Sequence, residues 1–311
     1  MYSKIISVGS YLPANCVTNN DLPKNLETSS EWIISRTGIK QRYIAAEGEL
    51  TSDLATAAAK IALGKAGLKE TDLIIVATTT PDNTFPACAA AVQRKLGFKN
   101  SFAFDVQAVC SGFVFALSVA DNYIKAGTAK TALVIGAETL TRIVDWNDRG
   151  TCVLFGDGAG AVVLQASETP GIIHSKLHTD GSYYDELYVD GGASQNTVGV
   201  LKMHGKEVFK HAVEKMGASI REAVEGTEYS LDDVKWVVPH QANLRIMDAI
   251  AERLELPKEK VIVTVDKHAN TSAASIPLAL AENWDKFKSG DLCVLTALGG
   301  GFSWGSVLVR L

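Results

Sequence analysis

Two parts of this chain repeat the same order of sequence elements at a nearly constant spacing. The apolar run after Asp72 corresponds to the run after Asp233, which comes 161 residues later. The runs ALVIGA and LCVLTA begin 160 residues apart, and the same interval separates Cys110 from Asn270. This spacing predicts an internal duplication, with accidental register as the alternative. A duplicated chain would form two similar halves, with equivalent helix starts meeting near a pseudo-twofold axis.

Short strand-like runs alternate with helical patterns in both halves. We expect strands at 73–80, 102–106, 132–136, 160–165, 234–238, 261–265, 292–296 and 306–311, and helices at 51–67, 88–96, 110–126, 244–254 and 270–284. Such alternation predicts an α/β fold with mostly parallel strands. Because no flexible linker separates the halves, 1–168 and 169–311, we expect them to form one compact unit.

Composition and charge exclude several classes of protein. A chain with 47% hydrophobic and 21% charged residues is ordinary for a globular protein, which excludes disorder. A formal net charge of −5 argues against nucleic-acid binding. The most apolar window, 101–120, contains Asp105 and Gln107, so we expect no membrane span and no targeting segment. Five cysteines without a CxxC pattern favour reduced thiols in the cytoplasm over disulfides or a zinc site.

Cys110 is a candidate nucleophile. It lies in DVQAVCSGF, where a predicted strand gives way to an apolar helix. The positive end of a helix dipole favours a thiolate, so we expect a lowered thiol pKa. The alternative is a small buried hydrophobic residue, which is the usual role of cysteine.

Two further residues and a glycine run are candidate partners of Cys110. His240 ends a predicted strand in VVPHQAN, where α/β folds bind ligands, or it is a structural histidine. Asn270 opens the helix in NTSAASIP, or it is a helix N-cap. The glycines at 299–301 can direct backbone N–H groups at an oxygen, as in an oxyanion hole, or form a plain hairpin turn.

Three other patterns are rejected. Residues 301–305 match G-x-S-x-G, but a strand follows where that motif needs a helix. The glycines at 156–160 precede a predicted strand and lack dinucleotide-binding spacing. His240 follows Cys110 by 130 residues, which fits papain-like proteases, but their C-G-[SA]-C-[WY] string is absent.

Four motifs in order, DVQAVCSGF, VVPHQANLR, HANTSAASIP and GGGFSWGS, closely resemble β-ketoacyl-[acyl-carrier-protein] synthase III. The resemblance covers essentially the whole chain and implies a thiolase-like fold of two αβαβα-type halves. It implies a homodimer that condenses acetyl-CoA with malonyl-[acyl-carrier protein] to 3-oxobutanoyl-[acyl-carrier protein], CoA and CO2. The reaction calls for no metal or redox cofactor, with coenzyme A entering as the thioester substrate.

The resemblance also implies residue roles. Cys110 would be the acylated nucleophile, with His240 and Asn270 stabilising the enolate, and the amides of Cys110 and Gly300 would form the oxyanion hole. The residues that would contact coenzyme A are Thr28, Trp32, Arg36, Arg149 and Asn243. Phe85 would cross the dimer interface and shape the acyl pocket of the partner subunit. Arg245, assisted by Lys210 and Arg253, would dock the acidic carrier protein.

Three residues depart from the family pattern. Leu298 stands where the family often has Phe, so we expect a different pocket shape near Cys110. Glu252 occupies a carrier-facing position that can be basic, so we expect weaker docking there. Ala269 replaces a common Gly, which we expect to be harmless.

Two other functions stay open at this point. A secondary-metabolite condensing enzyme would use the same three residues with a different acceptor. A non-catalytic scaffold of this fold would have lost one of them, whereas Cys110, His240 and Asn270 are all present.

Overall fold

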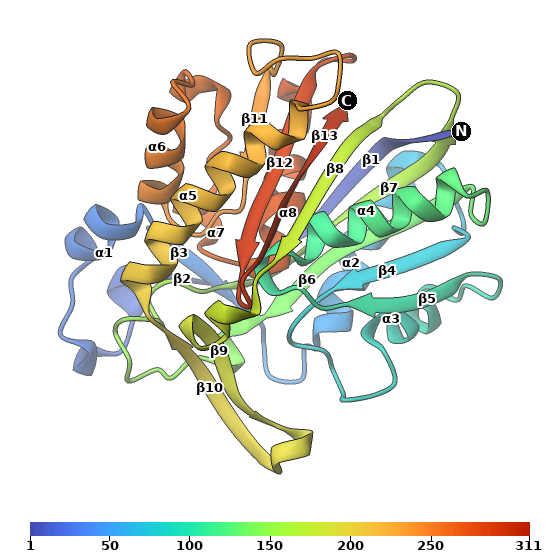
Figure 1. Cartoon of the computed structure of the whole chain (residues 1–311). Coiled ribbons are helices and arrows are strands. Elements are labelled where there is room, and N and C mark those ends of the chain that lie inside the picture. The colour runs from blue at the N-terminus through green and yellow to red at the C-terminus, as the bar shows by residue number, and fades with distance from the viewer.

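Two mixed β-sheets form the framework of residues 1–311, all of which the computed structural model describes (Figure 1). The strands of the first sheet are, in spatial order, β1 (Tyr2–Tyr11), β7 (Asp157–Ser167), β6 (Thr131–Thr139), β4 (Leu73–Ala77) and β5 (Phe102–Val106). Those of the second are β11 (Trp236–Pro239), β12 (Leu292–Gly299), β13 (Ser303–Arg310) and β8 (Ile172–Thr179).

The two sheets are built alike, which confirms the predicted duplication. The order β8-β13-β12-β11 repeats the order β1-β7-β6-β4. Strand directions match as well, because β6 is antiparallel to β7 and parallel to β4, while β12 is antiparallel to β13 and parallel to β11. The strand β5 also has a remnant counterpart, since Val261 makes a single parallel bridge to Val237 in β11.

The helices cover both faces of each sheet. Two lie between the sheets, α4 (Gly112–Lys125) and α8 (Ser275–Glu282). The outer face of the first sheet is covered by α2 (Thr51–Ala66) and α3 (Cys88–Leu96), and that of the second by α5 (Gly205–Val224) and α6 (Leu244–Arg253). This layering confirms the αβαβα-type fold class.

Smaller elements lie outside the layers. The short helix α1 (Ser30–Thr37) contacts α6, and α7 (Val265–His268) contacts β3 (Gln41–Ile44), which pairs with β2 (Asn15–Thr18). A hairpin of β9 (Leu187–Gly192) and β10 (Thr197–Met203) projects from the body of the molecule (Figure 1). No helix in the structure has the length and apolar character needed to cross a bilayer.

The expectation of mostly parallel strands is wrong. Only the pairs β4–β5, β4–β6 and β11–β12 are parallel, whereas the other pairs in the two large sheets are antiparallel. The helices α3 and α4 carry the chain back between parallel strands, but no α-helix joins β6 to β7. Without a crossover helix the chain returns in the opposite direction.

The prediction of a strand at 261–265 is also wrong, because only Val261 bridges to a neighbouring strand and α7 begins at Val265. Gln241 explains this, because its side-chain Oε1 accepts hydrogen bonds from the backbone N–H groups of Thr264 and Val265 at 2.7 and 3.1 Å. Its Nε2 donates to the carbonyl oxygen of Ile262 at 3.0 Å. A side-chain amide thus takes the place of a neighbouring strand, and the chain turns into α7 instead.

Glycines allow the first sheet to approach the segment that begins α8. A Cβ atom at Gly136 in β6 would lie 2.1 Å from the carbonyl oxygen of Ala273, and one at Gly160 in β7 would lie 2.6 Å from the backbone nitrogen of Leu278. Any side chain at these positions would push the 3₁₀ turn η8 (Ser272–Ala274) and α8 off the sheet. The expected single helix at 270–284 is therefore a turn, a helix and a further turn at Trp284–Lys286.

Candidate active site

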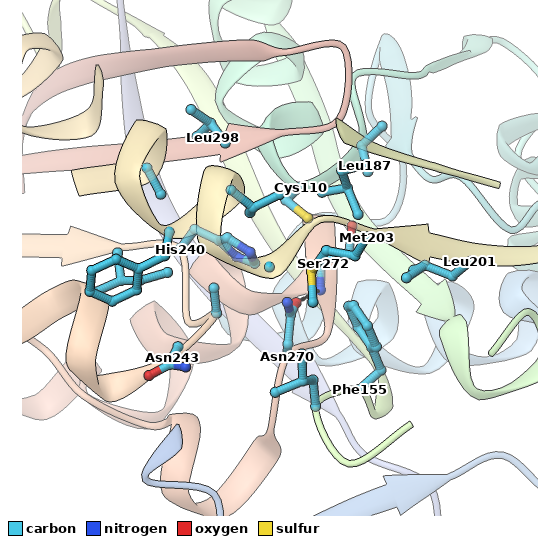
Figure 2. Close-up of a pocket in the computed structure, with 18 of the residues that line it drawn as sticks. Cys110, Phe155, Leu187, Leu201, Met203, His240, Asn243, Asn270, Ser272 and Leu298 are labelled. Atoms are coloured by element: carbon cyan, nitrogen blue, oxygen red, sulfur yellow. Dashed lines mark hydrogen bonds between the residues drawn. The ribbon is translucent and has the colours of Figure 1, made fainter. Parts of the chain in front are cut away.

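A mostly apolar cavity of about 110 Å³ lies where the two halves meet (Figure 2). Cys110, His240 and Asn270 all line it, so the fold brings these sequence-distant candidates together. Two further polar residues, Asn243 and Ser272, also face the cavity. The apolar part of the wall includes Leu140, Phe155, Leu187, Leu201, Met203 and Leu298.

Cys110 precedes the central helix in a short 3₁₀ turn, η3 (Val109–Ser111), instead of starting α4 directly. The preceding residue, Val109, has a φ of +49°, which turns the chain sharply out of β5. Only 5% of Cys110 is exposed, and burial raises the pKa of its thiol to about 12. The expected lowering of this pKa is therefore wrong, because the loss of solvation outweighs the neighbouring groups that favour the thiolate.

His240 is fixed at the end of β11 by two contacts. Its backbone N–H donates to the carbonyl oxygen of Thr296 at 2.8 Å, and its ring Nδ1 lies 2.7 Å from Oγ of Ser275. The same Oγ accepts the backbone N–H of Gln241 at 3.3 Å. When the Ser275 hydroxyl donates its proton to Nδ1, the ring proton lies on Nε2, which is the tautomer that can donate into the cavity. Burial lowers the pKa of His240 to about 3, so the ring is a neutral donor at neutral pH.

Asn270 is oriented by the turn that follows it. Its side-chain Oδ1 accepts the backbone N–H of Ser272 at 2.8 Å, and Figure 2 shows this contact beside Cys110. Its backbone N–H donates to the carbonyl oxygen of Leu154 at 2.9 Å. The contact with Ser272 resembles the N-cap role considered above, although α8 begins only at Ser275. With Oδ1 occupied, the amide group of Asn270 is free to act as a donor.

The glycine run packs directly against the backbone of Cys110. A Cβ atom at Gly299 would lie 2.6 Å from the backbone nitrogen of Cys110. The next residue, Gly300, approaches Leu187, since its Cβ atom would lie 2.5 Å from that carbonyl oxygen. An oxyanion hole formed by the amides of Cys110 and Gly300 stays a prediction. Such a hole needs rigidly held N–H donors, and the packing of Gly299 against Cys110 holds this loop in place.

The two glycine motifs that the sequence analysis rejected are each followed by a strand, as expected. Residues 301–305 run into the strand β13, so the helix of a nucleophile elbow is absent. The glycines at 156–160 lead into β7, so the helix of a dinucleotide site is absent as well.

The residues expected to contact coenzyme A form a group next to the cavity. Asn243 lines the cavity and donates from Nδ2 to the carbonyl oxygen of Arg36 at 3.1 Å, which ties α6 to the end of α1. The guanidinium of Arg149 lies 5.1 Å from the ring centre of Trp32. Thr28 lies two residues before α1, and its Oγ1 is buried without a hydrogen-bond partner.

The expected docking residues lie outside the cavity, on the surface of two adjacent helices. Arg245 lies in the first turn of α6, with its guanidinium 5.7 Å from the ring centre of Phe209 in α5. Lys210 in α5 and Arg253 in α6 are exposed. Glu252 is exposed on the same helix as Arg245. Phe85 is 83% exposed and does not line the cavity of its own chain.

Sequence reasoning missed three polar residues around the cavity. Ser275 binds His240, Ser272 binds Asn270, and Glu138 is a fully buried carboxyl near Cys110. Both serines lie inside the quoted motif HANTSAASIP, so their proximity to Asn270 was a usable signal. Glu138 gives no such signal, because an acidic residue near the end of an apolar strand is normally solvated.

The chain matches two models of one protein family. Residues 104–181 match 3-oxoacyl-[acyl-carrier-protein (ACP)] synthase III, and residues 224–311 match its C-terminal part. The curated beta-ketoacyl-[acyl-carrier-protein] synthase III of Ehrlichia canis (strain Jake) is 58% identical, and that of Paramagnetospirillum magneticum (strain ATCC 700264 / AMB-1) is 59% identical. Each match covers 99% of both chains. The crystal structure of 3-oxoacyl-[acyl-carrier-protein] synthase III from Aquifex aeolicus VF5 has a TM-score of 0.95 at 51% identity, covering 99% of this chain and 100% of that one.

Ala269, beside Asn270, adopts a backbone conformation that favours glycine. Its φ is +58° and its ψ is −163°, a region that residues with a Cβ atom rarely occupy. The expectation that Ala is harmless here is therefore wrong, because the Cβ atom adds strain of roughly 1–3 kcal/mol.

We predict that Ala269→Gly raises the free energy of unfolding by about 1 kcal/mol. Relief of strain exceeds the entropic cost of glycine, which is roughly 0.4–1 kcal/mol. Chemical denaturation measures the change, with Ala126→Gly as the control because Ala126 has an ordinary φ of −72°. The control should lose stability. A loss of stability in Ala269→Gly as well would contradict the strain.

Proposed function

The chain belongs to the 3-oxoacyl-[acyl-carrier-protein] synthase III family, and we propose that Cys110, His240 and Asn270 are its catalytic residues. It is an acyl-transferring condensing enzyme that initiates fatty acid synthesis. It joins acetyl-CoA to malonyl-[acyl-carrier protein] and releases coenzyme A and CO2. The observation that carries the residue assignment is the shared cavity, in which one thiol faces two neutral hydrogen-bond donors.

The first half-reaction loads the acetyl group. The sulfur of Cys110 attacks the thioester carbonyl of acetyl-CoA, an S–C bond forms, and coenzyme A leaves. The developing oxyanion accepts hydrogen bonds from the amides of Cys110 and Gly300. The contact of Gly299 with the Cys110 backbone supports this role, because it holds the loop and the sulfur in one rigid unit.

The second half-reaction forms the carbon–carbon bond. Loss of CO2 from the malonyl group leaves an enolate, whose oxygen accepts hydrogen bonds from Nε2 of His240 and Nδ2 of Asn270. The enolate carbon attacks the acetyl carbon, and the sulfur of Cys110 leaves. Two neutral donors suit this step, because a charged imidazolium is costly in a buried apolar cavity. Decarboxylation itself makes the nucleophile, so this proposal includes no metal or redox cofactor.

The two substrates are proposed to enter past Asn243. Trp32 and Arg149 form a cation–π pair whose aromatic ring and guanidinium suit the flat adenine of coenzyme A, with Arg36 in α1 and Thr28 just before it. Asn243 links this group to the cavity through its bond to Arg36. Leu298 and Phe85 are proposed to shape the acyl pocket, Leu298 from within the cavity and Phe85 from a partner subunit.

The carrier protein is proposed to dock on α5 and α6. Exposed Lys210, Arg245 and Arg253 present positive charge there, which suits an acidic partner. Arg245 is close to the cavity, because Asn243 caps its helix and accepts the backbone N–H of Arg245 at 2.9 Å. Glu252 reduces the positive charge of this surface.

A homodimer is proposed on the side of the β9–β10 hairpin. Phe85 is 83% exposed, and Val198 on the hairpin is fully exposed, beside an open cleft that contains Thr84 and Val189. The adjacent strand β5 is an edge of the first sheet, which leaves backbone groups available for pairing. Exposed apolar side chains beside an unpaired edge favour burial against a second copy. Five unpaired cysteines agree with a cytoplasmic enzyme.

We predict that Asn270→Ala separates the two half-reactions. The variant should still form an acetyl-enzyme, because the sulfur and the glycine loop are unchanged. Release of CO2 from malonyl-[acyl-carrier protein] should fall about 10²–10³-fold, the effect of one lost oxyanion hydrogen bond. Single-turnover acetylation and CO2 release measure the two steps.

Cys110→Ala is the matched control for this experiment. Intact-protein mass spectrometry should show one acetyl adduct on the wild type and none on this variant. An adduct that persists without Cys110, or an Asn270→Ala variant that releases CO2 normally but cannot be acetylated, would overturn the assignment.

We predict that Arg245→Glu raises the KM for malonyl-[acyl-carrier protein] at least tenfold and leaves acetyl loading nearly unchanged. The difference should shrink at high salt, because exposed charge pairs are screened. Steady-state kinetics at two salt concentrations measure it. An equal loss of both half-reactions would mean that Arg245 supports the fold instead of docking.

We predict that the protein sediments as a dimer and that Val198→Asp shifts it toward monomer. A charge on the exposed hairpin would be buried without a partner in the dimer. Sedimentation velocity over a concentration series measures the shift. Val263→Asp, at an exposed valine between α6 and α7, should leave the dimer intact. A monomeric wild type at all concentrations would refute the proposed interface.

A further inference from the structure

Arg42, in β3, carries a charge that has no opposite charge beside it. Its side chain is completely buried, and none of the ion pairs in the structure includes it. Burial lowers the pKa of the Arg42 guanidinium to about 10, so the group still carries its charge at neutral pH. Charged side chains are almost never fully buried unless they are paired, because the loss of solvation is costly. The hydrogen bonds of Arg42 therefore call for an explanation beyond the filling of space.

The guanidinium of Arg42 joins two segments that are far apart in the sequence. Its Nη2 donates to the carbonyl oxygen of Val153 at 2.8 Å, and its Nη1 donates to Oδ1 of Asn19 at 3.0 Å. Asn19 is buried as well, and its Nδ2 donates to the carbonyl oxygen of Ile39 at 2.7 Å. A guanidinium presents its donors in a rigid plane, so Val153 is held at a fixed place relative to a buried anchor.

The residues directly after Val153 hold the backbone of Asn270. The carbonyl oxygen of Leu154 accepts the N–H of Asn270 at 2.9 Å, and the N–H of Gly156 donates to the carbonyl oxygen of Asn270 at 3.0 Å. Phe155, between them, forms a parallel bridge with Asn270, and Figure 2 shows the two side chains next to each other. Asn270 is thus attached on both sides to a segment that begins at Val153.

Arg42 is the one side chain from elsewhere in the chain that hydrogen-bonds to residues 152–156. The far end of this segment is fixed by Asp157, whose side-chain oxygens accept the backbone N–H of Thr141 at 2.9 Å and that of Ala45 at 2.8 Å. The near end depends on the guanidinium. Loss of the guanidinium would free one end of the segment while the other end stays in place.

We propose that Arg42 is a positioning residue for carbon–carbon bond formation: it holds Val153, and through the segment after Val153 it holds Asn270 where its amide meets the enolate. The inference rests on the proposed role of Asn270. Arg42 does not line the cavity, so it acts on the reaction only through the residues it holds. A catalytic group displaced by about 1 Å can lose roughly a hundredfold in rate, so a support of this kind has a measurable effect.

The test is Arg42→Met, which keeps a long unbranched side chain and removes both donors and the charge. Release of CO2 at saturating malonyl-[acyl-carrier protein] should fall roughly tenfold or more, because Asn270 is displaced but still present. Single-turnover acetylation of Cys110 at saturating acetyl-CoA should keep its wild-type rate. Intact-protein mass spectrometry measures the acetylation, and its final extent gives the folded, active fraction to which both rates are normalised.

A double variant tests whether the effect passes through Asn270. Arg42→Met combined with Asn270→Ala should release CO2 at the same rate as Asn270→Ala alone, because two residues that act as one unit are not additive. Arg42→Lys retains the charge and a donor without the planar fork, so its loss of CO2 release should be smaller than that of Arg42→Met. If Arg42→Met does not fold, the same criteria apply to Arg42→Lys.

Ser7→Ala is the matched control. Oγ of Ser7, in β1, donates to the carbonyl oxygen of Ala62 in α2 at 2.8 Å, and both residues are buried. The control therefore also deletes a buried hydrogen bond from a side chain to a distant backbone carbonyl, on the outer face of the first sheet. It should lose stability in chemical denaturation and keep both half-reactions at the wild-type rates.

Three results would contradict the role of Arg42. The first is a normal rate of CO2 release in Arg42→Met, and the second is an equal loss of both half-reactions after normalisation. The third is a double variant whose loss is the product of the two single losses, which would mean that Arg42 acts independently of Asn270. By contrast, normal CO2 release in Asn270→Ala alone would refute the proposed catalytic assignment itself, so the two failures are distinguishable.

Discussion

The close backbone contact between the first sheet and the segment that begins α8 determines most of the site. At Gly136 and Gly160 there is no room for a side chain, so the second half of the chain presses directly on the first. This contact fixes η8, and η8 fixes Ser272 and Asn270 beside Cys110. The catalytic groups therefore depend on sheet packing more than on the loops that carry them.

Burial is the second constraint, because it sets the protonation states. Without water, the thiol of Cys110 and the ring of His240 both prefer their neutral forms. For His240 this suits the chemistry, since a neutral N–H donor can bind an enolate oxygen without prior charge. For Cys110 the same burial disfavours the thiolate that attacks the thioester.

Much of this organisation could be predicted from the residues. The offset between Cys110 and Asn270 predicted equivalent places in two halves, and four ordered motifs indicated the family. Other features depend on contacts that no local pattern encodes. The side chain of Gln241 takes the place of a strand partner for the residues after Val261. The apolar run at 261–265 therefore wrongly predicted a strand. The thiol pKa could not be predicted either, because helix position is visible in sequence whereas the depth of burial is not.

The place of β13 in the second sheet has a consequence for synthesis on the ribosome. This strand follows every other strand of its sheet in the chain, yet it lies between β12 and β8. The strand β8 must therefore wait without its partner while more than a hundred later residues are translated, which takes several seconds at roughly 5–20 residues per second. During that interval β8 exposes an unpaired edge, the kind of surface that recruits chaperones or aggregates. The nascent chain can complete the first sheet early, but the second sheet closes only after β13 has emerged from the exit tunnel.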